Sequence, residues 1–125
     1  MEVDMLEKRH ILVVDDLKVN FLLIKAMLIK HGMQVSWAEN GYLAIEKVKS
    51  DPNIHAILMD YNMPGIDGLE TTLMIKALRP DLKVISHSTF TDTPSFDRKN
   101  APFDDYLPKP INCSQLMSLL EKHLA

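Results

Sequence analysis

Features that would place this chain outside the cytoplasm are missing from its 125 residues. Its single cysteine, Cys113, allows no internal disulfide, as is typical of proteins in reducing compartments. No apolar run approaches the roughly 20 residues that a membrane-spanning helix needs. The first ten residues are mostly polar and contain no signal-peptide core. We therefore expect a globular, cytoplasmic chain that does not contact a membrane.

A strong charge of one sign is missing too, because the net charge is only −3. This excludes general electrostatic attraction to nucleic acid, so we expect no direct nucleic-acid binding. The five histidines are scattered, which leaves no zinc-binding pattern. There are no repeats, low-complexity stretches, linkers or second composition block. The length fits one core, and we expect a single domain over residues 1–125.

Short apolar runs alternate along the chain with segments of helical periodicity. The predicted strands are 11–14, 33–38, 54–60, 82–88 and 103–107. The predicted helices are 18–31, one from the cap Asn40 that stops by 50–52, one from the cap Asp67 that stops at Pro80, and 111–124. Strand–helix alternation predicts an α/β fold, with a mainly parallel sheet covered by helices on both faces.

Each predicted helix has an apolar stripe that we expect to face the core rather than a partner. The stripes are Val19, Leu22, Leu23, Ala26 and Met27; Leu43, Ala44 and Val48; Leu69, Leu73 and Ala77; and Leu116, Leu119, Leu120 and Leu124. The segment 89–102 breaks the alternation, because Pro94 and Pro102 bracket a polar stretch without such a stripe. We expect a short or irregular helix there.

Acidic residues end two of the predicted strands. Asp15 and Asp16 follow the first strand, and Asp60 closes the strand 54–60. If these strands are neighbours, the three carboxylates converge and repel one another unless a cation is bound. A site made of carboxylates suits Mg²⁺. Asp15 and Asp16 could instead only cap the helix that follows them, and for Asp67 capping is the better reading.

Two further side chains complete the parts needed for phosphoryl transfer. Lys109 follows the last predicted strand, and Ser88 ends the strand before it. A cation and a lysine neutralise phosphoryl oxygens, a hydroxyl donates a hydrogen bond, and Asp60 would be the nucleophile that forms an acyl phosphate.

These residues together resemble the receiver domain of two-component response regulators over essentially the whole chain. The matching stretches are 14–16, 59–64, Asp67-Gly68, Ser88, Tyr106 and Lys109-Pro110. The resemblance implies a doubly wound, five-stranded parallel sheet of flavodoxin-like order 2-1-3-4-5. The stretch 15–20 further resembles receivers of hybrid sensor kinases.

The resemblance also implies a role for each site residue. Asp60 would accept the phosphoryl group of a phosphohistidine, supplied by a histidine kinase or a histidine phosphotransfer domain. Mg²⁺, or Mn²⁺, would be bound by Asp16 directly, by Asp15 through water, by Asp60, and by the backbone carbonyl of Asn62. Ser88 would bind a phosphoryl oxygen. Ser88 and Tyr106 would shift an active/inactive equilibrium, and the Lys109–Pro110 peptide would be cis.

The position two residues after Ser88 holds Phe90. In the family this position and Asn62 flank the path of the hydrolytic water, so the ring of Phe90 predicts slow loss of the phosphoryl group. The downstream protein partner is left open. The chain would act as a phosphoacceptor rather than as an enzyme with a separate substrate.

Two other functions compete with this one. A receiver-like interaction module that acts without phosphorylation is suggested by the unusual segment 89–102. An aspartate-nucleophile phosphatase fits less well, because such enzymes need Asp-x-Asp after the first strand, and here the two acids are adjacent.

Overall fold

The computed structural model describes residues 6–61, 63–88 and 102–124, and strands and helices alternate through most of them. The strands are β1 (His10–Val14), β2 (Gln34–Ala38), β3 (Ala56–Asp60), β4 (Lys83–Ser88) and β5 (Asp105–Pro108). The helices are α1 (Lys18–Ile29), α2 (Gly41–Ser50), α3 (Gly68–Leu78) and α4 (Cys113–Leu124). None of these helices is long and apolar enough to cross a membrane.

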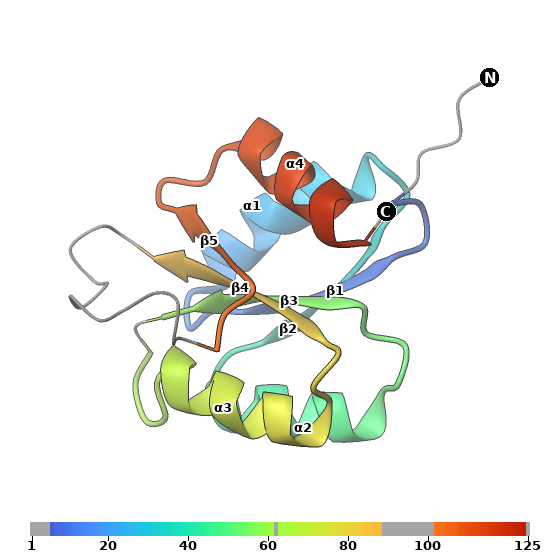
Figure 1. Ribbon diagram of the computed structural model, residues 1–125. Coiled ribbons are helices and arrows are strands. Elements are labelled where there is room, and N and C mark those ends of the chain that lie inside the picture. Colours follow the sequence, from blue (N-terminus) through green and yellow to red (C-terminus); the bar gives the residue numbers. More distant parts are fainter. Residues whose placement is uncertain (1–5, 62, 89–101, 125) are drawn as a thin grey trace.

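The five strands form one sheet in the order β2-β1-β3-β4-β5, and every neighbouring pair is parallel. Helices α1 and α4 cover one face, and α2 and α3 cover the other (Figure 1). Both the α/β class and the strand order predicted from the sequence are confirmed. Because all strands run the same way, their carboxyl ends meet at one edge, where open α/β sheets place their ligands.

Each face of the sheet has its own apolar core. On the α1/α4 face, Leu116 and Leu120 of α4 are buried against β-strand residues, as the stripe of that helix predicts. The stripe predicted for α1 is wrong except at Met27, which is partly buried against this core. Val19, Leu22 and Leu23 are 67%, 49% and 50% exposed, and the buried residues of this helix are Phe21, Ile24 and Leu28. Apolar residues occupy most positions of α1, so their spacing alone does not identify the buried face.

The stripes predicted for α2 and α3 are also partly wrong. Leu43 and Leu73 are exposed, whereas Thr71, Thr72 and Ile75 of α3 are buried. The two threonines can lie in the core because their hydroxyls are satisfied within the helix. Thr71 Oγ1 donates to the Asp67 carbonyl at 2.7 Å, and Thr72 Oγ1 donates to the Gly68 carbonyl at 2.7 Å. Their methyl groups are then free to pack against apolar neighbours.

The helix caps agree with the sequence better than the element ends do. Asn40 accepts from the backbone of Leu43, and Asp67 accepts from the backbone of Glu70, each at 2.9 Å. Helix α1 ends at Ile29 rather than at residue 31, and the turn after it contains Gly32 with a φ of 73°. Such a left-handed backbone favours glycine. Strand β3 begins at Ala56 rather than at residue 54. The predicted irregular helix at 89–102 falls, apart from Pro102, outside the described residues.

Two adjacent aspartates fix β5 to both helical layers. Asp104 Oδ2 accepts from Lys76 Nζ of α3 at 2.6 Å and from the backbone N–H of Val84 at 2.8 Å. Asp105 Oδ2 lies 3.0 Å from His123 Nε2 and 3.3 Å from Lys122 Nζ, both on α4. Hydrogen bonds from His123, the Tyr106 backbone and Lys122 outweigh burial and lower the pKa of Asp105.

We expect Asp104→Ala to lower the free energy of unfolding by about 2–3 kcal/mol. The substitution leaves the fully buried N–H of Val84 and the half-buried ammonium of Lys76 without this acceptor. Urea denaturation at pH 7 measures the change. The matched control is Asp81→Ala, an exposed acid before β4, for which we expect less than about 0.5 kcal/mol. Equal losses in the two variants would contradict the role given to Asp104.

Candidate functional site

Three carboxylates converge at the carboxyl edge of the sheet, as predicted. Asp15 and Asp16 follow β1, Asp60 ends β3, and the two strands are hydrogen-bonded neighbours. One carboxylate oxygen of each residue lies within 4.8 Å of the others. Asp15 and Asp60 are buried, at 1% and 3% exposure, while Asp16 is open to solvent. No other group of at least three His, Cys, Asp or Glu side chains in 6–61, 63–88 and 102–124 is arranged for a metal.

The donor set of this site fits a hard divalent cation. It consists of carboxylate oxygens alone, which Mg²⁺ prefers, and it combines two buried acids with one that solvent reaches. Buried carboxylates this close together repel strongly, so a cation between them removes a real electrostatic cost. The reading that Asp15 and Asp16 merely cap α1 is not supported, since the residue at the cap position of that helix is Leu17.

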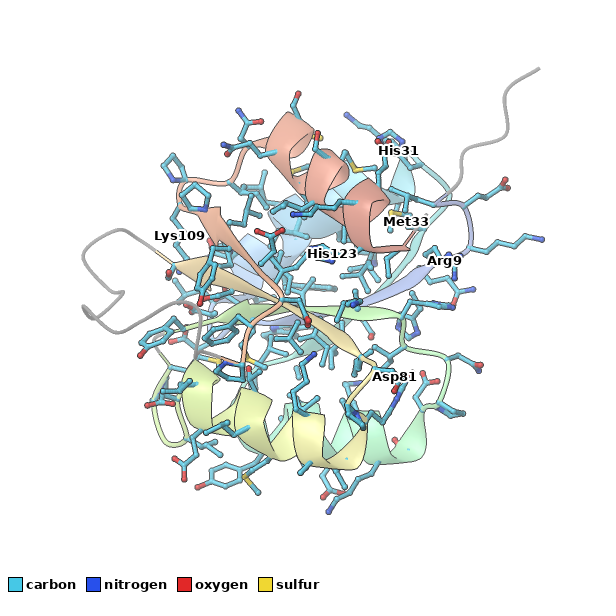
Figure 2. All side chains as sticks on the ribbon, viewed as in Figure 1. Arg9, His31, Met33, Asp81, Lys109 and His123 are labelled. Atoms are coloured by element: carbon cyan, nitrogen blue, oxygen red, sulfur yellow. The ribbon has the colours of Figure 1, made fainter. Side chains whose placement is uncertain are left out.

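Lys109 supplies a fixed positive charge beside Asp60. Its Nζ lies 3.1 Å from Asp60 Oδ1, and its backbone N–H donates to the Ser88 carbonyl at 2.9 Å. The Lys109–Pro110 peptide is cis, as the resemblance implies. Figure 2 places the Lys109 side chain at the end of the sheet toward which the strands β4 and β5 point, with Asp81 near the opposite end of β4. The Lys109 ammonium is therefore in contact with Asp60, the proposed nucleophile.

Ser88 and Tyr106 come from the neighbouring strands β4 and β5. Ser88 is buried and ends β4, and its register partner in β5 is Pro108. Tyr106 is half-buried, and its ring meets that of Phe103 edge-on at a centroid distance of 5.8 Å. Phe103 lies 6.2 Å from the ring of Tyr61, which follows Asp60. An aromatic row thus connects the residue after Asp60 with Tyr106 in β5.

A glycine lets α3 begin directly against the end of β3. A Cβ atom at Gly68 would lie 2.4 Å from the carbonyl oxygen of Asp60 and 2.8 Å from Tyr61 Cα. Both are backbone atoms that cannot rotate away, so any side chain at residue 68 would displace Asp60 or the helix. The expected ligand Asn62 and the expected shield Phe90 lie outside the described residues.

Sequence reasoning did not foresee how Asp15 is held. The backbone N–H of Leu17 donates to Asp15 Oδ1 at 2.9 Å, and Asn20 Nδ2 lies 3.3 and 3.2 Å from Oδ1 and Oδ2. Trp37 Nε1 on β2 donates to the Asp15 carbonyl at 2.8 Å. Asn20 follows Asp15 by five residues, a separation at which neither helix nor strand periodicity predicts a contact, so the sequence offered no signal for this hydrogen bond.

His87 is a second unforeseen feature. It pairs in register with Asp60, is 5% exposed, and its Nε2 has no hydrogen-bond partner among the described residues. Burial, and then the charge of Lys109, lower the pKa of His87 to about 4, so its ring is neutral at pH 7. Together with Asn20 and Lys109 it lines a cavity of about 180 Å³ between α1 and the end of β5.

The sequence matches the family model of the response regulator receiver domain over residues 11–121. The chain belongs to the response regulator receiver family. The acidic pocket of Asp15, Asp16 and Asp60 is the kind that phosphoacceptor receivers carry. This family is not a classical enzyme family.

Known receivers of similar sequence occur in larger signalling proteins. The sensor histidine kinase GacS of Pseudomonas protegens is 31% identical over 121 residues. That alignment covers 90% of this chain but only 13% of GacS. The receiver therefore corresponds to a small part of this relative, whose other activities do not transfer to it.

Two solved receivers share the fold closely. The receiver domain of a sensor histidine kinase from Pseudomonas aeruginosa PAO1, with magnesium coordinated in its active-site cleft, is 30% identical with a TM-score of 0.82. The match covers 94% of this chain and 98% of that one. The response regulator TrrA of Thermotoga maritima, in complex with Mg²⁺ and BeF, is 34% identical with a TM-score of 0.83, covering 93% and 99%. Solved relatives thus contain Mg²⁺, and the acidic triad of this receiver is able to bind a metal.

Proposed function

We propose that this receiver accepts a phosphoryl group on Asp60 from a phosphohistidine. The observation that carries the proposal is the surroundings of the Asp60 carboxylate. It is buried at a sheet edge, within 4.8 Å of two further carboxylates, and it has the Lys109 ammonium 3.1 Å from Oδ1. A purely structural role would not require three acids and one lysine around one point.

The transfer step follows from these groups. A carboxylate oxygen of Asp60 attacks the phosphorus atom, a new O–P bond forms, and the N–P bond of the phosphohistidine breaks with its electron pair returning to the imidazole. A bound Mg²⁺ would supply positive charge to the phosphoryl oxygens, and Asp15, Asp16, Asp60 and the Asn62 carbonyl would hold it. Lys109 neutralises a second part of that charge, and the Ser88 hydroxyl donates to a phosphoryl oxygen.

The phosphorylated state would be reported through β4 and β5. Ser88 ends β4 and Tyr106 lies in β5, so a hydroxyl drawn toward the phosphoryl group changes the space beside the aromatic row. We propose that these two residues shift the receiver between inactive and active states. Residues 1–125 would form a single receiver domain, which accepts the phosphoryl group itself and has no separate substrate.

The exposed apolar residues of α1 suggest where the phosphohistidine donor binds. Leu17 is the cap residue of the helix that follows Asp15 and Asp16, Val19, Leu22 and Leu23 lie on that helix, and all four are about half exposed or more. Apolar patches of this kind mark protein contact sites. We propose that a histidine kinase or a histidine phosphotransfer domain of the cytoplasm docks on this face, which brings its histidine to Asp60.

Intact mass after incubation with a small phosphodonor and Mg²⁺ tests the proposal. We expect a gain of one phosphoryl group in the wild type and in Asp81→Asn, and no gain in Asp60→Asn. Asp81 is the matched control because it is an exposed acid at the other end of the sheet. If the wild type gains no mass but still binds a kinase partner, the chain is instead an interaction module that acts without phosphorylation.

We further predict that Phe90→Ala shortens the lifetime of the phosphorylated receiver. Phe90 stands two residues after Ser88, and its ring would shield the acyl phosphate from water. The half-life of the phosphoryl group, followed by mass after removal of the donor, should fall by about 10-fold, a change of about 1.4 kcal/mol in the barrier. An unchanged half-life would contradict the shielding role.

A further inference from the structure

Asn20 of α1 donates to both oxygens of the Asp15 carboxylate. Its Nδ2 lies 3.3 Å from Oδ1 and 3.2 Å from Oδ2, while the backbone N–H of Leu17 donates to Oδ1 at 2.9 Å. Asp15 is 1% exposed, so water cannot readily replace these donors. The orientation of one of the three site carboxylates is therefore set by an amide side chain that belongs to no strand end.

The element that carries Asn20 is firmly placed. Phe21, next to Asn20, packs its ring on Trp37 with a centroid distance of 5.6 Å and an interplanar angle of 13°, and Ile24 is 1% exposed. Trp37 in turn donates from Nε1 to the Asp15 carbonyl at 2.8 Å. The side chain of Asp15 is thus held by Asn20 and its main chain by Trp37, and the Trp37 ring stacks on Phe21, the residue after Asn20.

The chemistry of the amide matters as much as its place. An arginine or lysine at residue 20 would neutralise Asp15 and weaken the attraction of the triad for a cation. The neutral amide orients the carboxylate and leaves its charge in place. Hydrogen bonds from the outer shell of this kind commonly change metal affinity by about 10- to 100-fold.

We propose that Asn20 is a positioning residue that makes the acidic triad selective for Mg²⁺. Mg²⁺ demands near-ideal octahedral geometry, whereas Ca²⁺ tolerates loose and variable ligand arrangements. A carboxylate whose orientation is fixed by Asn20 and Leu17 meets the geometric demand of Mg²⁺, whereas a freely rotating carboxylate does not. The inference rests on the proposed function, because it assumes that the triad takes a divalent cation.

The test compares Asn20→Ala with the wild type in titrations with Mg²⁺ and with Ca²⁺. Isothermal calorimetry without any phosphodonor gives the dissociation constants, and the fluorescence of Trp37, the only tryptophan, follows the same titrations at the Asp15 carbonyl. We expect the Mg²⁺ affinity to fall about 10-fold or more and the Ca²⁺ affinity to fall by less. Asn53→Ala, an exposed asparagine at the amino edge of the sheet, should leave both affinities unchanged.

Two results would overturn the inference. Unchanged affinities in Asn20→Ala would show that Asp15 needs no orientation. An equal loss for both cations, together with a lower unfolding temperature of the metal-free variant, would show that Asn20 only stabilises the fold. In either case a wild type that still gains a phosphoryl group leaves the proposed function intact. If the wild type binds neither Mg²⁺ nor Ca²⁺, both the inference about Asn20 and the proposed function are overturned.

Discussion

Lys109→Met should lose about 3 kcal/mol of stability in the presence of a chelator, and Mg²⁺ should restore most of it. The Lys109 ammonium contacts Asp60, which is 3% exposed and lies within 4.8 Å of two further acids. Removing it leaves a buried carboxylate among like charges, one of the few changes that cost several kcal/mol in a small domain. A divalent cation supplies the missing positive charge at the same place.

Urea denaturation with chelator and with Mg²⁺ measures this effect. The matched control is Lys122→Met, which removes an ammonium 3.3 Å from Asp105. The Lys122 side chain is 68% exposed, so we expect less than about 1 kcal/mol and no dependence on Mg²⁺. If Lys109→Met lost the same stability with and without Mg²⁺, Lys109 would not compensate the charge of the triad.

Asp16→Asn should change the free energy of unfolding in the opposite direction. It removes one of the repelling charges and should therefore stabilise the metal-free protein.

His87→Leu should stabilise the protein at pH 7 and remove much of its sensitivity to mild acid. At pH 7 the gain is about 1 kcal/mol, because a buried Nε2 that has no partner among the described residues is replaced by an apolar group. The pKa of His87 is about 4 in the folded chain, against 6.5 for a free histidine. Between these values the unfolded chain binds a proton that the folded chain does not.

The sign of the pH dependence follows from that difference. Stability contributed by neutral His87 is fully present above pH 6.5 and is lost as the pH falls toward 4, by up to about 3 kcal/mol. We expect the stability gap between His87→Leu and the wild type to widen from pH 7 to pH 4.5 in chelator. The acidic triad titrates in both proteins, so its contribution cancels when the free energies of unfolding of the two proteins are subtracted at each pH. A gap that stays constant would mean that His87 is protonated while folded.

The sequence was sufficient for the strands and for the acids at their carboxyl ends, because both depend on local signals. The short apolar runs Ile11–Val14 and Ala56–Met59, which end in acids, predict buried strands. Caps such as Asn40 and Asp67 are equally local, since donor and acceptor lie three residues apart. The strand order came from the family resemblance, since periodicity alone does not order strands.

The buried faces of the helices were not predictable in the same way. Helix α1 is apolar almost throughout, so the choice of Phe21, Ile24 and Leu28 over Val19, Leu22 and Leu23 is made by the shape of the sheet beneath. In α3 the pattern was misleading because threonines are polar by composition but satisfied by their own helix. The hydrogen bonds from Asn20 and Trp37 to Asp15 depend on tertiary placement, which no spacing in the sequence encodes.

The adjacent acids Asp104 and Asp105 have a consequence for engineering this receiver. The chain enters β5 at a position set by Lys76 of α3 on one side and His123 of α4 on the other. The place of Lys109, a few residues later, therefore depends on both helices. Engineering of α3 or α4 at these two contacts would therefore also move the lysine that lies beside Asp60.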